Sequence, residues 1–284
     1  MINAALAMEG GALRGMFTAG VVDVLMENDI YLEYTSGISA GSLAGLDYVS
    51  KQPGRTAEVN LKHINDKEYC GLYSLVKHRM IFNFDYLFGD ISHNLIPFDY
   101  DEFENNEMRF SCAATNVRTG EAVFFEKGRC TDIYSGARAS SSLALFSRMV
   151  EIDGEKYLDG GYSMPIPYQK CFDEGYDKVI IITTRPKGYR KLPVAGRMKR
   201  AYMSVYRNYP ELVKALINTP RVYNAQMREI EKLEAAGKVL VIRPEKPIDL
   251  GSVERDVDKL DKLTKEGIRV GRKNLERIKE YLCI

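Results

Sequence analysis

The first fifty residues alternate between short apolar runs and helical stripes of apolar residues. Residues 3–8 form a mostly apolar run that ends at two glycines, which predicts a buried strand and a tight turn. Apolar residues then recur at helical spacing over 16–28. The arrangement repeats, with a strand predicted over 30–35, a turn over 37–41 and a helix over 42–50. Two such units predict an α/β sheet whose ligand-binding edge lies at the carboxyl ends of its strands.

The remainder of the chain predicts strands and helices in mixed order. Helices joined by loops are expected over 55–94, and an amphipathic helix pair over 257–281. Strands are expected over 108–117, 122–126, 178–184 and 239–242, and a hairpin over 149–158 that turns at Asp153-Gly154. The pattern therefore predicts a mainly parallel sheet with antiparallel edge pieces. One domain is expected, because no linker rich in Gly, Ser or Pro divides the chain.

Composition narrows the class of protein only modestly. The chain has 284 residues, 45% of them hydrophobic, which is enough to bury a full core. The formal net charge of +1 provides no global field that would attract nucleic acid, so no nucleic-acid partner is expected. No run reaches the roughly twenty uncharged apolar residues that cross a bilayer. The five cysteines are widely spaced and fit neither a disulfide framework nor a zinc site, so we expect a reducing cytosol.

A basic segment follows the expected strand over 178–184. No acid interrupts it, and tyrosines lie among or just after its basic residues, which are Arg185, Lys187, Arg190, Lys191, Arg197, Lys199 and Arg200. One interpretation is a solvated loop and helix start. The other is an interfacial cap that meets anionic lipid head groups.

A candidate nucleophile lies in Gly37-Ile38-Ser39-Ala40-Gly41, between a predicted strand and a predicted helix. Small neighbours allow the backbone to turn sharply and present the Ser39 hydroxyl at the sheet edge. The following amide, that of Ala40, and the helix N-terminus then point toward developing negative charge. The pattern alone is weak, but its position between strand and helix favours a serine nucleophile.

A glycine-rich loop follows the first strand, with the sequence Glu9-Gly10-Gly11-Ala12-Leu13-Arg14-Gly15. Clustered glycines allow backbone N–H groups to converge on phosphate or on an oxyanion. A dinucleotide fingerprint would need glycine in place of Ala12 and has no role for Arg14. A P-loop would need Gly-Lys-Ser/Thr, which is absent. We therefore interpret the loop as an oxyanion loop, with nucleotide binding as the rival.

The histidines exclude the triad order of the α/β-hydrolases. The chain has three histidines, His63, His78 and His93. That order places the histidine last, after the serine and the acid, and no histidine follows His93. Each lies in an ordinary helix or loop stretch, which favours a structural role. A carboxylate base is the alternative: Asp159 ends a predicted strand, and Gly160-Gly161 permits a tight turn that aims its side chain.

Together these blocks resemble the patatin-like phospholipases, a family of lipid acyl hydrolases with a Ser-Asp dyad. The resemblance covers roughly residues 3–185 and rests on the order and spacing of three blocks. The matching residues are Gly10, Gly11, Arg14 and Gly15 in the oxyanion loop, Gly37, Ser39 and Gly41 in the elbow, and Asp159, Gly160 and Gly161 in the Asp-Gly-Gly block. The small residues 136–141 resemble a further stretch of the family. Ala12 departs from the family's glycine, and strain is expected there if the position requires a positive φ.

The resemblance implies a three-layer α/β/α sandwich, with 1–185 as catalytic core and 186–284 as a helical cap region completing the same domain. It implies hydrolysis of a lipid or other acyl ester, with Ser39 as nucleophile and Asp159 as base. The oxyanion would be held by amides around Gly11, Ala12 and Ala40. Neither a metal nor a cofactor is implied, and the oligomeric state stays open.

For Arg14, two roles are left open. One is bracing of the oxyanion loop through hydrogen bonds to backbone carbonyls, and the other is direct contact with a phosphate head group. The rival functions are a catalytically silent lipid-binding protein that docks on membranes and, behind it, a nucleotide-binding protein. A cytoplasmic location with peripheral contact to an anionic membrane is expected.

Overall fold

The computed structural model describes residues 1–251 and 253–284 and contains one mixed sheet. Its strands are β1 (Ile2–Met8), β2 (Leu32–Gly37), β3 (Arg109–Asn116), β4 (Ala122–Glu126), β5 (Val150–Ile152), β6 (Glu155–Asp159), β7 (Val179–Ile182) and β8 (Val239–Ile242). They lie in the order β5-β6-β3-β2-β1-β7-β8, and β4 also pairs with β3. Strands β3, β2, β1, β7 and β8 run parallel to one another, whereas β4, β5 and β6 form antiparallel pairs. The predicted mainly parallel sheet is confirmed.

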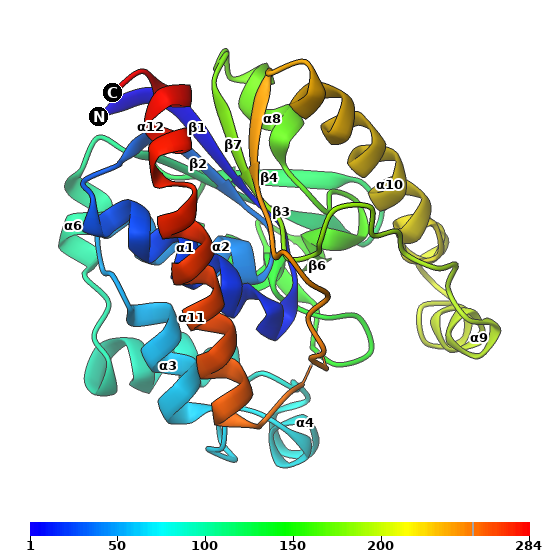
Figure 1. The fold of residues 1–284 in the computed structure, drawn as a ribbon. Coiled ribbons are helices and arrows are strands. Elements are labelled where there is room, and N and C mark those ends of the chain that lie inside the picture. The colour runs from blue at the N-terminus through cyan, green and yellow to red at the C-terminus, as the bar shows by residue number, and fades with distance from the viewer. Residues whose placement is uncertain (252) are drawn as a thin grey trace.

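Helices cover both faces of this sheet (Figure 1). They are α1 (Gly15–Glu27), α2 (Ala40–Val49), α3 (Arg55–His63), α4 (Leu72–His78), α5 (Phe84–Tyr86), α6 (Tyr100–Asn105), α7 (Ile133–Ser140), α8 (Tyr168–Asp173), α9 (Gly196–Val205), α10 (Pro210–Ala235), α11 (Val257–Lys273) and α12 (Leu275–Leu282). Three further helical segments are η1 (Ala12–Arg14), η2 (Leu87–Leu95) and η3 (Gly160–Tyr162). The fold is thus a three-layer α/β/α arrangement.

Strand β1 shows why both faces are covered. Leu6 and Met8 belong to the large core cluster that also contains Phe17 of α1. Ala5 and Ala7 point the other way, into a second cluster with Tyr223 of α10. Because successive side chains of a strand alternate between faces, a continuous apolar run requires helices on both sides. This explains the unbroken apolar character of the run in the sequence.

Residues 186–284 contribute to both the sheet and its cover. Strand β8 pairs in parallel with β7 at the sheet edge. Helix α11 packs along α1, and the two helices cross closely because glycines face each other (Figure 1). A methyl group added at Gly20 would lie 2.2 Å from the carbonyl oxygen of Thr264, and one at Gly267 would lie 2.2 Å from that of Phe17. Any larger side chain at either glycine would force the helices apart.

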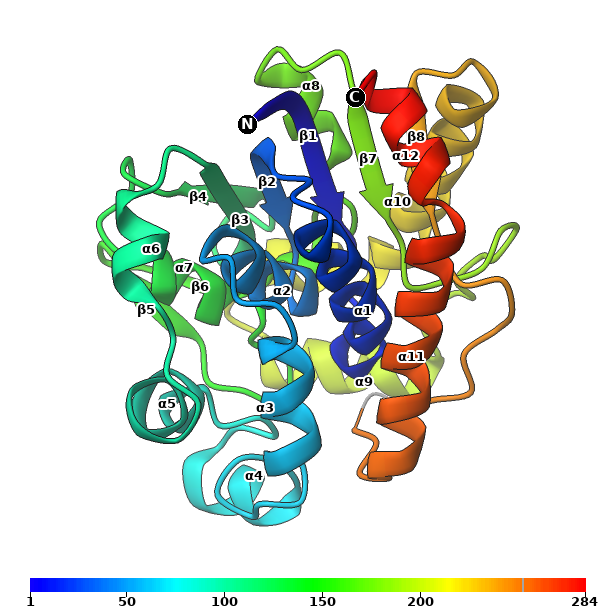
Figure 2. The same cartoon turned by 60° about the vertical axis from the view of Figure 1, so that its left-hand side comes forward.

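The strand register brings three chain segments together at one edge of the sheet. Met8 of β1 pairs with Gly37 of β2 on one side and with Ile182 of β7 on the other. The loops that follow these residues therefore emerge side by side. Figure 2 shows α3 and α4 gathered at the end of the molecule toward which β1 and β7 point. The expected ligand-binding edge lies at this end.

Candidate active site

Ser39 occupies a sharp turn between β2 and α2. Its backbone has φ 53° and ψ −124°, a conformation that a non-glycine residue adopts only at a cost. The Ser39 N–H donates a 2.9 Å hydrogen bond to Oγ of Ser140, which lies in the small-residue stretch at the end of α7. The turn is tighter than predicted: β2 extends through Gly37 and α2 begins at Ala40, so only two residues lie between strand and helix.

The turn at Ser39 is tight because its glycines allow the end of β2, the start of α2 and the end of β1 to approach one another closely. A methyl group added at Gly41 would lie 2.6 Å from the carbonyl oxygen of Met8, and one at Gly37 would lie 2.3 Å from that of Gly41. No side chain fits at such distances. The glycines of the elbow are therefore required by close packing against β1.

The sheet register brings Asp159 to the same level as Ser39. Strand β3 lies between β2 and β6, with Gly37 paired to Cys112 and Asp159 paired to Ala114. Because Ser39 follows Gly37 by two residues and Ala114 follows Cys112 by two, both side chains flank the same point of β3. Two residues separated widely in sequence thus meet across one strand.

The carboxyl group of Asp159 is almost closed to solvent, with 4% exposure. Burial raises its pKa to about 6, while the nearby Ser39 side chain, a hydrogen bond from the Gly161 N–H and the charge of Lys191 act to lower it. The Gly161 N–H lies 2.7 Å from Oδ1, and the Thr115 hydroxyl donates to the Asp159 carbonyl at 2.8 Å. The Gly161 N–H holds the carboxylate in one orientation, and the Thr115 hydroxyl holds the backbone beside it. Burial gives the carboxylate a basicity that an exposed aspartate lacks.

The glycine-rich loop lies directly against the elbow. A methyl group added at Gly10 would lie 3.1 Å from Cβ of Ser39, and one at Gly15 would lie 2.6 Å from Cβ of Ala40. Within the described residues, the N–H groups of Gly11, Ala12 and Ala40 have no hydrogen-bond acceptor. Donors that are free and close to a hydroxyl can bind an oxyanion that forms there.

Ala12 stands where the family has glycine, and its backbone adopts the positive φ that was expected to cause strain there. Its φ is 46°, in the left-handed region where a Cβ is unfavourable. The strain at such a residue is on the order of 1 to 2 kcal/mol. The loop keeps its shape with alanine, and it stores this strain beside the nucleophile.

A buried group of charges lies behind the loop. The Glu9 carboxylate is 3% exposed and accepts a 2.7 Å hydrogen bond from the Thr184 N–H. Burial raises the pKa of Glu9, while the nearby charges of Lys191, Arg14 and Arg185 lower it. Burial also lowers the pKa values of Lys191 and Arg14. Lys191, Arg14 and Arg185 therefore lie near the single carboxylate of Glu9, in a poorly hydrated part of the protein.

Two expectations about basic residues need correction. Over the residues that the structure describes, the Arg14 side chain donates no hydrogen bond to a loop carbonyl, and its Nε atom is buried without a partner. Lys191 is not part of a solvated loop. The Lys191 backbone forms two hydrogen bonds with the side chain of Asn224 in α10, and the Lys191 ammonium lies 4.4 Å from the centroid of the Tyr223 ring. The basic segment thus sends one cation inward, because Glu9 and Asp159 lie there.

An apolar pocket opens at Ser39. Its apolar walls come mainly from η1, α1, α2, α3 and the segment around α5 and η2, and include Leu13, Met16, Leu43, Leu46, Val59, Phe82, Phe84, Leu87, Phe88, Phe98 and Leu143. An apolar lining of this kind suits an acyl chain.

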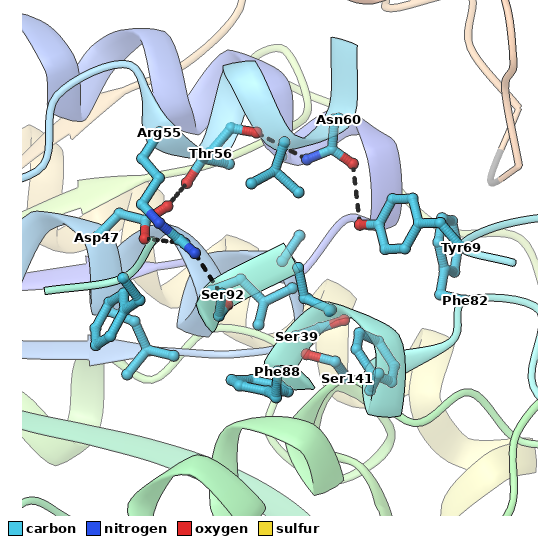
Figure 3. A pocket seen from close by; sticks show the side chains of 18 of the residues that line it. Ser39, Asp47, Arg55, Thr56, Asn60, Tyr69, Phe82, Phe88, Ser92 and Ser141 are labelled. Carbon is cyan, nitrogen blue, oxygen red and sulfur yellow. Dashed lines mark hydrogen bonds and ion pairs between the residues drawn. The ribbon is translucent and has the colours of Figure 1, made fainter. Parts of the chain in front are cut away.

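The pocket also has a polar wall (Figure 3). Figure 3 shows Asp47, Arg55 and Thr56 on the side of the pocket away from Ser39. Arg55 Nη1 lies 2.8 Å from Oδ1 of Asp47, and the Thr56 hydroxyl donates to the other oxygen of that carboxylate. Arg55 also donates to the Ser92 hydroxyl at 2.9 Å. The charges satisfy one another, so this wall closes the pocket without offering a free charge.

The histidines take no part in this pocket. His78 lies 2.8 Å from Glu68 and His93 stacks on Tyr100, while neither these nor His63 line the space beside Ser39. Over the part of the chain that the structure describes, no group of three or more His, Cys, Asp or Glu side chains could hold a metal ion.

The sequence did not predict the contact of Ser140, the inward position of Lys191 or the Asp47–Arg55 pair. Ser140 lies in the small-residue stretch, but its bond to the Ser39 amide depends on packing of α7. Lys191 lies in the basic segment, but the carboxylates near it, Glu9 and Asp159, are distant along the chain. No motif marks Asp47 and Arg55, which pair between α2 and α3.

Comparison with known proteins assigns the family. The family model described as patatin-like phospholipase matches residues 6–171. The chain belongs to this family. A second family model, described as a domain of unknown function (DUF6363), matches residues 209–283.

Individual relatives of this patatin-like chain are distant. YjjU, an uncharacterised protein of Escherichia coli strain K12, is 27% identical over 255 residues, which cover 86% of this chain and 69% of that protein. Lysophospholipase NTE1 of Candida albicans is 24% identical over 280 residues, covering 93% of this chain and 19% of that protein. The crystal structure of VipD from Legionella pneumophila aligns with a TM-score of 0.49 and 12% identity, over 96% of this chain and 67% of that one. The family assignment supports lipid hydrolysis as the general class of activity.

Proposed function

We propose that the protein is a lipid acyl hydrolase that cleaves carboxylic esters through a covalent acyl-enzyme, with Ser39 as nucleophile and Asp159 as base. The observation that carries the proposal is the position of the Ser39 side chain, which lies close enough to the buried carboxylate of Asp159 to lower its pKa and opens onto an apolar pocket. A carboxylate whose pKa is raised toward neutrality is a better base for a hydroxyl than an exposed one. The family assignment agrees with this class of reaction.

In the first step the Ser39 oxygen attacks the ester carbonyl carbon, and its proton passes to Asp159. Negative charge that develops on the carbonyl oxygen is held by the N–H groups of Gly11, Ala12 and Ala40. As the carbon–oxygen bond to the alcohol breaks, Asp159 returns the proton to the leaving oxygen. The acyl chain stays bound to Ser39 and lies in the apolar pocket.

In the second step a water molecule takes the place of the alcohol. Asp159 accepts a proton from this water as its oxygen attacks the acyl carbon, and the same amides hold the second oxyanion. When the bond to Ser39 breaks, the serine oxygen regains its proton from Asp159. The carboxylic acid then leaves, and neither metal nor cofactor enters this scheme.

We also propose that residues 1–185 form the catalytic core and that 186–284 complete the same domain. The pairing of β8 with β7 and the packing of α11 on α1 support this division. Lys191 supports it too, since this residue of the later segment lies close enough to Asp159 to lower its pKa.

A fluorophosphonate probe tests the nucleophile directly. Wild-type protein should be labelled, Ser39→Ala should not, and Ser204→Ala, a matched change on an exposed part of α9, should be labelled like wild type. Products released from a mixed lipid extract, measured by mass spectrometry for wild type against Ser39→Ala, identify the ester class. Absence of labelling in folded wild-type protein would instead favour the catalytically silent lipid-binding protein.

A further inference from the structure

The segment 185–210 contains no Asp or Glu. Its Arg190 is paired with Glu231 of α10. Four other cations, Lys187, Arg197, Arg200 and Arg207, are exposed, and among the residues that the structure describes none of the four forms an ion pair. The segment therefore presents a run of positive charge with no acidic residue inside it.

Large apolar side chains are exposed within the same segment. Leu192 is 84% exposed, Met203 57% and Val205 61%. Helix α9, at the centre of the segment, has no buried residue. Figure 1 shows α9 standing away from the sheet, beyond the end of α10. Large apolar side chains exposed along one segment, two of them on a protruding helix, indicate a surface that meets something apolar.

The segment is tied to the wall of the pocket. The Leu145 N–H donates a 2.7 Å hydrogen bond to Oη of Tyr206, which directly follows α9 and is 5% exposed. Ser141 and Leu143, a few residues before Leu145, line the pocket beside Ser39. A membrane or another molecule that binds α9 is therefore held close to the pocket.

We propose that the segment 185–210, centred on α9, is a docking surface for an anionic lipid bilayer. Exposed Leu, Met and Val side chains interleaved with Lys and Arg match the boundary between anionic head groups and acyl chains, where both can be satisfied at once. A nucleic acid or an acidic protein would satisfy the cations but leave the apolar side chains in water. Docking does not depend on the proposed hydrolase activity.

Vesicle co-sedimentation of the full chain carrying Ser39→Ala tests the proposal without turnover. We expect binding to phosphatidylcholine vesicles that contain phosphatidylserine, weak binding to phosphatidylcholine alone, and loss of binding at high salt. Arg197→Gln, Arg200→Gln and Arg207→Gln together should weaken binding on the order of 100-fold. Leu192→Ser, Met203→Ser and Val205→Ser together should weaken it as well, with an unchanged circular dichroism spectrum.

A charge-matched control is available on the helices α10, α11 and α12. Arg228→Gln, Lys262→Gln and Arg277→Gln remove the same charge from exposed positions outside the segment and should leave binding unchanged. An equal loss in this control would reduce the effect to net charge and overturn the proposal. So would binding that ignores anionic lipid. Equal affinity for a duplex DNA oligonucleotide, unaffected by the three serine substitutions, would reveal a general polyanion patch and also overturn it.

Discussion

Ser39 and Asp159 lie 6% and 4% exposed on opposite sides of β3, and the Ser39 side chain is close enough to the Asp159 carboxylate to lower its pKa. The serine adopts a positive φ, and burial leaves the aspartate with a raised pKa. Both features cost stability, and both suit the proposed roles of nucleophile and base.

The pH dependence of turnover should report Asp159. As a base it acts only when ionised, and burial raises its pKa to about 6. We expect kcat/KM for a soluble ester to fall below about pH 6 and to rise toward a plateau above pH 7. Lys191→Met removes a nearby positive charge that lowers this pKa, so the acidic limb should move to higher pH. Lys191→Arg keeps the charge and is the matched control. An acidic limb near pH 4 in wild type would contradict the assignment.

Asp159→Asn should abolish turnover and yet stabilise the protein at alkaline pH. The folded pKa is above the ordinary value, so the folded state bears the cost of burying the ionised carboxylate when pH exceeds about 6. Removing that charge should raise the free energy of unfolding at pH 8 by about 1 to 3 kcal/mol. The gain should shrink as pH falls from 6 to 4, because the wild-type carboxyl then binds its proton in the folded state. Urea unfolding at pH 8 and pH 4 measures this difference.

Ala12→Gly should stabilise the protein, against the usual effect of that substitution. Relief of the positive φ should raise the free energy of unfolding by about 1 to 2 kcal/mol, and the added freedom of the unfolded chain should lower it by about 0.5 to 1 kcal/mol. We expect a net gain of roughly 0.5 to 1 kcal/mol in thermal or urea unfolding. Ala201→Gly, inside α9, is the matched control and should be destabilising. Destabilisation by both would show that the loop does not strain Ala12.

The pocket should set the acyl length that the enzyme accepts. Val59 is buried in α3 and lines the pocket. Val59→Phe fills part of the space, so kcat/KM should fall at least about tenfold for long-chain p-nitrophenyl esters and little for the acetate. Leu95→Phe, at a 51% exposed position outside the pocket, should leave the chain-length profile unchanged. An equal loss on all esters would mean that acyl chains bind elsewhere.

The buried pair of Asp47 and Arg55 should matter for folding more than for chemistry. Asp47→Ala leaves the Arg55 guanidinium buried without its carboxylate, which should cost about 3 to 5 kcal/mol in urea unfolding. Asp261→Ala breaks a pair on the surface of α11 and should change stability little. Similar effects of the two variants would show that the pair is hydrated.

Much of the fold could be predicted from the chain because its signals are local. The apolar run of β7 and the turn at Asp153-Gly154 depend on neighbours in sequence, and both elements formed where expected. The boundaries around Ser39 were less accurate, since the helix begins as soon as one residue has absorbed the positive φ. Ser39 is held by its bond to Ser140 and by the packing of its neighbour Gly41 against β1, which no local pattern contains.

The sequence alone determined which reacting groups the protein has: a serine in a glycine elbow, an aspartate before two glycines, and no late histidine to serve as base. Only the tertiary structure decided that Ser39 and Asp159 meet across Ala114, that Lys191 turns inward, and that α9 leaves apolar side chains in water. The reason is physical. Glycine, turn and strand preferences act within a few residues, whereas burial, pKa shifts and exposed surfaces arise from contacts between segments that the sequence keeps apart.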